Sequence, residues 1–205
     1  MTEWTKRTYK QNQEDLKTAT SPYVDDGGKV NKIPLDKSTG ALTTITYGHH
    51  EIHEGDSFHC AVSTASIGGE VGDHLHLTFT TADVAKKAHM VFHVESTGGV
   101  AVTLTEGWTG GGTSGSSKPI YNRNRSSTNT SASIPTVTTG AAVTTGGTVL
   151  MTRHIGAGKT SGGGLRASDE WILKPNTKYS LRAHDTTTGV STFIEMDWYD
   201  HADRK

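Results

Sequence analysis

The chain has 205 residues, of which 32% are hydrophobic and 24 are glycine, enough apolar material for one large all-β domain with its own core. Its 20 lysine and arginine residues nearly balance 21 acidic residues, and the resulting formal charge of −1 argues against nucleic acid as a partner. The single cysteine excludes an internal disulfide framework, and no apolar run approaches the roughly 18 residues of a membrane span, so no membrane partner is expected.

Residues 1–40 are polar, and their apolar positions follow neither a helical nor an alternating period. Trp4, Tyr9 and Tyr23 are scattered along this segment. The start of the chain lacks the apolar region of a signal peptide, which predicts synthesis in the cytoplasm. We interpret the segment as an extended arm that orders on a partner and buries its aromatic rings there, with a frayed terminus as the alternative.

Residues 41–205 contain segments rich in Thr, Val and Ile that are separated by glycines, a pattern typical of β-structure. The predicted strands cover residues 41–47, 58–63, 74–80, 89–95, 100–106, 134–139, 148–154, part of 170–177, 179–184 and 190–199, and residues 81–88 predict a loop or a single helical turn. About ten short strands without amphipathic helices predict a single all-β domain, an antiparallel β-sandwich or jelly roll with long loops rich in Gly, Ser and Thr.

Alternation predicts which face of the strands lies inside. In residues 74–80 the apolar side chains occupy every second position, and His74 and His76 occupy the positions between them. The pair Gly98-Gly99 predicts a tight hairpin that makes residues 89–95 and 100–106 antiparallel neighbours. Near the start of the domain, Gly55 predicts a bend that joins the first strands.

A long polar loop follows Trp108, and loops of this length carry binding or assembly contacts more often than short ones. Within it, residues Asn122, Arg123, Asn124 and Arg125 form a polar contact patch rather than a flexible linker. Further along, Trp171 opens a segment that we interpret as an edge strand ending at Pro175. Because proline cannot donate to a β-ladder, a neighbouring chain would begin or stop pairing there.

Histidines and carboxylates concentrate in two short stretches, and His49, His53, His74 and His76 are the candidate metal ligands. A cupin-type site requires a glutamate shortly after the His74 and His76 pair, and Phe79 stands in that neighbourhood instead. Alternation also directs this pair away from the apolar face, toward solvent or another chain. We therefore predict no metal and no cofactor; the alternatives are surface histidines, a pH-sensitive cluster between subunits, and a catalytic metal.

Other catalytic arrangements are incomplete. Cys60 lies among apolar residues, which predicts a buried, inert thiol rather than a nucleophile. Residues 156–161 lack the spacing of a phosphate-binding loop. Asp197, Asp200 and Asp203 lie close together in sequence, and we interpret them as a solvated strand end rather than an acid/base pair. The sequence therefore predicts that the protein is not an enzyme.

Five motifs in the order they occur resemble a family of small structural proteins in tailed-phage virions. They are Ile52-His53-Glu54-Gly55-Asp56-Ser57-Phe58, Val94–Gly99, Leu104–Gly107, Asn122–Arg125 and Glu170–Tyr179, the last being the most recognisable. The similarity spans about Tyr47 to Tyr199. It implies a non-enzymatic virion protein of the capsid-decoration type, whose partners are the major capsid protein or other virion proteins and copies of itself.

A capsid-decoration protein needs a rigid β-core, polar loops and an arm that orders on its neighbours. The assembly residues are then expected in the arm, the polar patch and the edge strand: Trp4, Tyr9, Tyr23, Asn122, Arg123, Asn124, Arg125, Trp171 and Pro175. Self-association as a homotrimer is the hypothesis. A carbohydrate-binding β-sandwich that stacks sugars on Trp108, Tyr121 and Trp171 is an alternative function, and a cupin-type metalloprotein is a second one.

Overall fold

The computed structural model describes residues 20–24, 30–34, 47–67, 74–111, 115–140, 144–156, 163–166, 170–186 and 189–202. The chain divides into two compact units, Met1–Thr46 and Tyr47–Lys205. In the first unit, β1 (Thr20–Val24) and β2 (Val30–Pro34) pair as an antiparallel ladder. The sequence pattern does not predict this ladder, because the two strands are short and lack apolar alternation. Trp4 and Tyr9 lie outside the described residues.

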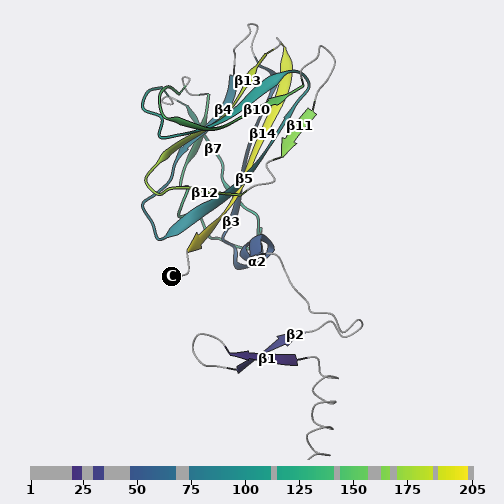
Figure 1. Cartoon of the computed structure of the whole chain (residues 1–205), viewed down its shortest axis with the longest axis vertical. Coiled ribbons are helices and arrows are strands. Elements are labelled where there is room, and N and C mark those ends of the chain that lie inside the picture. The colour runs from purple at the N-terminus through teal and green to yellow at the C-terminus, as the bar shows by residue number, and fades with distance from the viewer. Residues whose placement is uncertain are drawn as a thin grey trace, which may run out of the picture. The chain divides into compact units, whose positions relative to one another are not determined.

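The second unit is an antiparallel β-sandwich of two sheets (Figure 1). Sheet one has the strand order β10 (Thr148–Ile155), β6 (Val100–Glu106), β13 (Lys178–Asp185), β4 (His74–Thr80), β9 (Val137–Thr139) and β7 (Ser116–Lys118). Sheet two has the order β11 (Gly163–Arg166), β5 (Lys86–Ser96), β14 (Val190–Ala202), β3 (Ser57–Ile67) and β8 (Tyr121–Asn122), and β12 (Trp171–Ile172) also pairs with β5. The predicted all-β sandwich is confirmed, and the narrower jelly-roll connectivity stays a prediction.

The core lies between the inner faces of the two sheets. Central strand β14 contributes Met196 and Trp198, and the facing sheet contributes Leu104, Tyr179 and Leu181, all fully buried. Burial of a large apolar side chain stabilises a fold by about 1.5–3 kcal/mol, so this row supplies much of the driving force for packing the two sheets together. Residues 190–199 alternate in sequence, and this alternation is confirmed, since buried and partly exposed residues alternate from Val190 to His201.

The predicted hairpin at Gly98-Gly99 is wrong. Strand β5 lies in sheet two and β6 lies in sheet one, so this connection carries the chain from one sheet to the other. The corner is held by two backbone hydrogen bonds: the N–H of Thr97 donates to the carbonyl of Ser191, and the N–H of Thr186 donates to the carbonyl of Gly99. A glycine pair allows a tight turn between two strands of one sheet. A segment of the same length can also cross the gap of about 10 Å between two sheets, so the glycine pair does not distinguish the two connections.

The first element of the second unit is a helix, α2 (Tyr47–Glu54), where the sequence predicts a strand end and a bend. Gly55 ends it with a φ of 79°. The N–H of Gly55 donates to the carbonyl of Ile52 at 3.1 Å, and the N–H of Asp56 donates to that of Glu51 at 3.0 Å, which is a Schellman motif. The predicted bend is therefore a helix C-terminus. No described helix is long and apolar enough to cross a membrane.

Two strand predictions differ in extent from the structure. Residues 81–85 form a loop and β5 begins at Lys86, so no helical turn is present there. In the predicted strand over 134–139, only Val137–Thr139 pairs, and Ile134 is buried in the preceding loop, where its N–H donates to Oγ of Ser131 at 3.0 Å. The predicted strand residues 41–46 lie outside the described part of the chain.

Candidate functional site

The segment Asn122–Arg125 holds the turn that joins α2 to β3. The buried side chain of Asn122 donates from Nδ2 to the carbonyl of Gly55 at 2.6 Å and to that of Asn129 at 3.2 Å. Its Oδ1 accepts the backbone N–H of Asn124 at 2.8 Å, and Asn124 Nδ2 donates to the carbonyl of His53 at 3.1 Å. Both asparagines therefore use their amides to fasten the long loop to the C-terminus of the helix.

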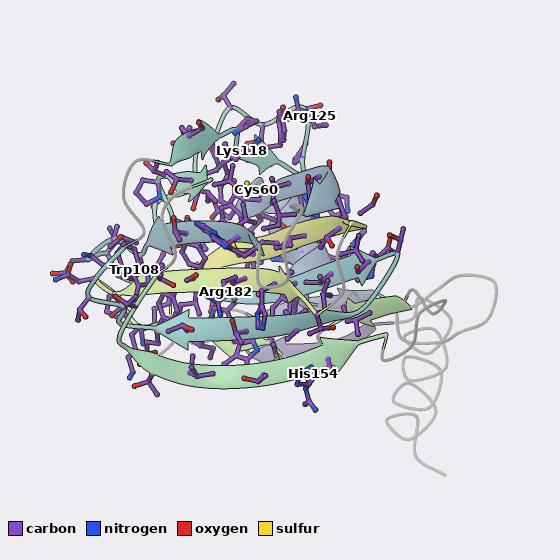
Figure 2. All side chains as sticks on the ribbon, turned by 90° about the horizontal axis from the view of Figure 1, so that it is seen from above. Cys60, Trp108, Lys118, Arg125, His154 and Arg182 are labelled. Carbon is purple, nitrogen blue, oxygen red and sulfur yellow. The ribbon has the colours of Figure 1, made fainter. Side chains whose placement is uncertain are left out.

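The two arginines of this segment are exposed. Arg123 Nη1 lies 3.8 Å from Oδ2 of Asp197, and the guanidinium of Arg125 lies 5.6 Å from the ring centroid of Tyr121. Arg125 is labelled in Figure 2. Of the other proposed assembly residues, Trp171 is partly buried against the core and Pro175 is exposed in a turn. The side chain of Tyr23 is not described, and the assembly role of these residues stays a prediction.

Glu106 joins two further motifs. Its Oε1 accepts a hydrogen bond from Nζ of Lys174 at 2.7 Å, and its Oε2 accepts one from the hydroxyl of Tyr179 at 2.9 Å. The Lys174 ammonium, and then the Tyr179 hydroxyl, lower the pKa of Glu106. Burial raises the pKa of Tyr179 well above its usual range, so this hydroxyl stays protonated and donates. The contact fastens the end of β6 to the turn before β13.

The three aromatic rings proposed as sugar platforms differ in exposure. Trp108 is only 7% exposed, and Nζ of Lys178 lies 4.5 Å from its ring centroid. Trp171 packs against the core, whereas Tyr121 is 49% exposed. Stacking on a sugar requires an open ring face, and of these three only Tyr121 is a largely exposed side chain.

Alternation directs His76, and likewise His89 of β5, toward solvent or another chain; solvent exposure is wrong for both, because both side chains are buried. His76 is 2% exposed, and burial, then the neighbouring His74 and Arg182, lower its pKa to about 4. The ring of His74 stacks on it with centroids 4.8 Å apart, and Arg182 lies directly opposite on β13. Alternation correctly places the ring of His76 on the outer face of the sheet. Neighbouring side chains on that face bury the ring.

His89 is buried at the end of the other sheet. Its Nδ1 donates to Oε1 of Glu170 at 2.6 Å, and its ring stacks on that of Tyr199 at a centroid distance of 4.8 Å. The hydroxyl of Tyr199 donates to the same carboxylate at 2.9 Å. Glu170 therefore binds both outward-facing rings, and this pairing of distant segments is invisible in the sequence.

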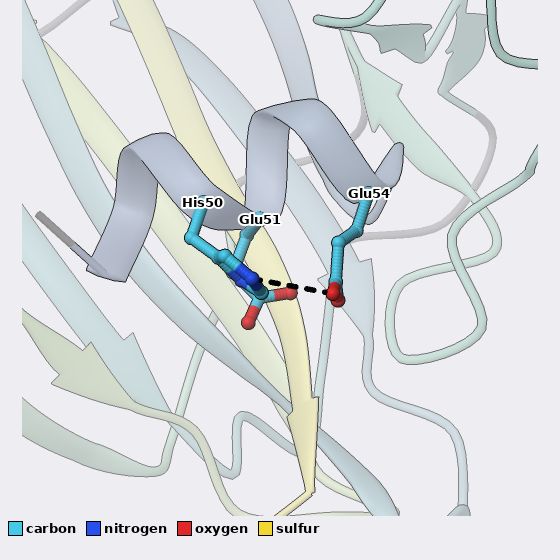
Figure 3. Close-up of side chains that lie close together, drawn as sticks. All are labelled: His50, Glu51 and Glu54. Atoms are coloured by element: carbon cyan, nitrogen blue, oxygen red, sulfur yellow. Dashed lines mark ion pairs between the residues drawn. The ribbon is translucent and has the colours of Figure 1, made fainter. Parts of the chain in front are cut away.

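A first group of potential metal ligands lies on α2. His50, Glu51 and Glu54 project from the helix with ligand atoms within 4.8 Å of one another (Figure 3). His50 Nε2 lies 3.4 Å from Oε1 of Glu54, an ion pair whose two side chains are about half exposed. Glu51 is buried, and its Oε1 lies 3.8 Å from Nδ1 of His201.

The four histidines named as candidate ligands fall into two pairs. His49 and His53 share a hydrogen bond between their Nε2 atoms at 3.0 Å, as residues four apart on a helix can. His74 and His76 stack on β4. The first pair belongs to a helix beside sheet two and the second lies on sheet one, and among the described residues the two pairs do not gather into one group of potential ligands. They do not form a four-ligand site.

A second group, which sequence reasoning missed, lies on the outer face of sheet two. His59 of β3, Glu195 and Asp197 of β14 have ligand atoms within 4.8 Å of one another, and His93 of β5 adjoins them. We call these four residues the sheet-face cluster. Alternation along β14 was the available signal, since it places both carboxylates on one face. The register that brings His59 and His93 alongside was not predictable.

The nucleophile and acid/base candidates have structural roles. Cys60, labelled in Figure 2, is buried, which confirms the predicted burial of its thiol, and burial raises the pKa of this thiol to about 11. The buried carboxylate of Asp200 accepts hydrogen bonds from the backbone N–H groups of Ala132 at 2.6 Å and Ser133 at 3.2 Å. The interpretation of a solvated strand end is therefore wrong for Asp200, which is 3% exposed. Asp197 lies on the opposite face of β14, so these two carboxylates are not paired. Asp203 lies outside the described residues.

No family model, curated protein or solved structure matches this chain.

Proposed function

We propose that the protein is a non-enzymatic structural protein of a tailed-phage virion, a capsid-decoration protein that binds the outside of the head. Its resemblance to such proteins rests on short motifs, and one observation supports the proposal most directly. The polar side chains of three of those motifs bond to the protein itself: Asn122 to the carbonyl of Gly55, and Glu106 to Tyr179 and Lys174.

In an active site, the polar side chains of such motifs would point toward a bound substrate. Here they fasten loops to the sandwich. The neutral amide–carbonyl bond of Asn122 contributes about 0.5–1.5 kcal/mol to stability, and the bond from the Tyr179 hydroxyl to the Glu106 carboxylate about 1.5–3 kcal/mol. A protein that has to hold long loops in a fixed arrangement on a particle surface needs such contacts. Virion localisation and the absence of catalysis both follow from this proposal.

The partner surface that fits this proposal is the exposed part of the same loop. Tyr121, Arg123 and Arg125 are exposed, and their backbone is held by the buried amide of Asn122 and the partly exposed amide of Asn124. Exposed aromatic and arginine side chains on a rigid backbone are the usual anchors of protein interfaces, because little conformational entropy is lost when they bind. The major capsid protein is the proposed partner, and a homotrimer is the proposed assembly.

Reconstitution tests this function. The full chain is mixed with purified capsids that lack it and the mixture is sedimented. We expect the wild-type chain to sediment with capsids, and the double substitution Arg123→Ser and Arg125→Ser to weaken this binding at least tenfold. Arg153→Ser, at an exposed arginine of β10, is the matched control and should bind as the wild type does. A wild-type chain that stays in the supernatant at saturating concentration contradicts the proposal.

A further inference from the structure

The sheet-face cluster is built by the register of three adjacent strands. Glu195 and Asp197 are two residues apart on β14 and therefore share a face. On one side Asp197 lies opposite His59 of β3, and on the other side Glu195 lies opposite His93 of β5. Each carboxylate thus has a histidine directly across from it, and the backbone hydrogen bonds of the sheet fix all four positions.

The distances between the polar atoms match those of ligands around one small cation. His59 Nδ1 lies 2.9 Å from Oδ1 of Asp197 and 3.6 Å from Oε1 of Glu195. Ligands held at about 2.0–2.2 Å from a zinc ion with tetrahedral angles lie roughly 3.3–3.6 Å apart, and smaller angles shorten that separation. Little movement is therefore needed to bring the three atoms onto one ion.

His93 has the contacts of a residue that orients such a site. Its Nδ1 lies 3.8 Å from Oε2 of Glu195, and its Nε2 lies 3.4 Å from Oε1 of Glu95. Carboxylate and imidazole groups behind the ligands are common at metal sites, because they fix the orientation of the ligands and raise their basicity. Glu195 can turn one oxygen to an ion while His93 holds the other.

Space and charge at the cluster also suit a cation. His93, Glu195 and Asp197 line a hollow of about 60 Å³ next to His59, which exceeds the roughly 10–15 Å³ that a cavity needs to hold one water molecule; His59 itself does not line it. Three carboxylates, those of Glu95, Glu195 and Asp197, face the two imidazoles and one guanidinium, that of Arg123. With neutral histidines this leaves two negative charges, which a divalent cation balances.

We propose that His59, Glu195 and Asp197 bind a divalent transition-metal ion, with His93 as a positioning residue. In the metal-free protein Nδ1 of His59 carries the proton that it donates to Asp197, because a carboxylate only accepts. Binding moves this proton to Nε2 and leaves the Nδ1 lone pair for the metal. The mixed nitrogen and oxygen ligands favour zinc over magnesium or calcium, which prefer oxygen alone.

The cluster on α2 is a weaker candidate. His50 and Glu54 are 48% and 54% exposed, whereas the side chains of His59, Glu195 and Asp197 are 30%, 31% and 17% exposed. Ligands on neighbouring strands are also held more firmly than those on the surface of a two-turn helix. This proposal does not depend on the place of the protein in a virion.

Titration calorimetry tests it, with the full chain stripped of metal by a chelator and Zn²⁺ as the probe. We expect Asp197→Asn and Glu195→Gln each to weaken Zn²⁺ binding at least about tenfold, with a smaller loss for His93→Gln. Arg123→Gln should tighten binding, because it removes the cation next to Asp197. Mg²⁺ and Ca²⁺ should bind more weakly than Zn²⁺.

Control variants separate this site from other histidines. The substitution His50→Gln removes the histidine of the α2 cluster and should leave the sheet-face affinity unchanged. Circular dichroism of each variant without metal establishes that it is folded; if Asp197→Asn does not fold, Glu195→Gln and His93→Gln, on two separate strands, decide. Zn²⁺ affinity that is unchanged in the folded cluster variants, or lost only in the helix variant, overturns the proposal.

Discussion

The hydroxyl of Tyr179 donates a hydrogen bond to Oε2 of Glu106 at 2.9 Å and accepts one from the backbone N–H of Lys174, also at 2.9 Å. One buried oxygen thus connects the end of β6 to the turn before β13. We expect Tyr179→Phe to lower the free energy of unfolding by about 1–3 kcal/mol, because it leaves the N–H of Lys174 and the carboxylate of Glu106 without this partner. Urea unfolding of both proteins measures it.

The control for this substitution is Tyr121→Phe, which removes a hydroxyl from an exposed ring and should change stability by less than about 0.5 kcal/mol. Equal unfolding midpoints for wild type and Tyr179→Phe would show that the contact contributes no net stability.

Gly55 tests how closely the loop that contains Ser127 packs on the C-terminus of α2. A Cβ at this position would lie close to Oγ and Cβ of Ser127, and its φ of 79° disfavours any side chain. Gly55→Ala should therefore destabilise by more than about 1 kcal/mol. Gly140→Ala is the matched control, since Gly140 has a φ of 71° and a Cβ added there would meet no atom of the described residues within 4 Å beyond its chain neighbours.

The difference between these two variants isolates the steric contact with Ser127, because both carry a similar backbone strain. The double variant Gly55→Ala and Ser127→Gly should recover part of the loss in thermal unfolding. If Gly55→Ala and Gly140→Ala are equally stable, the close packing of the loop on the helix C-terminus is not a constraint.

The β-core of this protein was predictable because alternation is a local signal. In β14 buried and partly exposed residues alternate, as the sequence predicts. In β4 the apolar Leu77 and Phe79 lie in the core as predicted, but His76 and Thr78 between them are buried as well. The connection between the two sheets at Gly98-Gly99 was not predictable, because a glycine pair indicates that the chain can turn but not which sheet the next strand joins. The helix α2 was missed because its sequence is polar, and its C-terminal signal, Gly55, also fits a simple bend.

The buried ring of His76 should make the free energy of unfolding depend on pH. Its pKa is lowered from 6.5 to about 4 in the folded protein, so the unfolded chain binds the proton more tightly. Stability from this residue is therefore complete above about pH 6.5 and is lost as the pH falls toward 4, at up to about 1.4 kcal/mol per pH unit. Unfolding by urea at several pH values between 4 and 7 measures the slope.

In the non-titrating variant His76→Gln, this slope should be smaller than in the wild type. His154→Gln, at an exposed histidine of β10 labelled in Figure 2, should keep the wild-type slope. Identical slopes for wild type and His76→Gln would contradict the burial of a neutral ring.

Substitution of Asp200 is expected to cause a large loss of stability. Its buried carboxylate accepts hydrogen bonds from backbone and hydroxyl groups of residues 131–133. Asp200→Asn replaces an acceptor by a donor among these groups, and we expect a loss of roughly 2–4 kcal/mol in urea unfolding. Asp83→Asn, in an exposed loop, is the control and should be neutral. A neutral Asp200→Asn would mean that the loop does not depend on this anchor.

The candidate sites differ in how far the sequence predicts them. The histidines of α2 are close together in sequence and are therefore candidate ligands, yet His49 and His53 pair with each other within one helix. The sheet-face cluster joins His59 to Asp197, 138 residues apart. Only the strand register of β3, β14 and β5 brings these residues together, and register depends on the whole sheet.

The most direct test of the proposed function is quantitative mass spectrometry of purified virions from cells that produce the protein. A capsid-decoration protein is expected in many copies per particle, in a fixed ratio to the major capsid protein, and it should stay bound through density-gradient purification. Particles that are complete and infectious but contain none of this chain would contradict the account.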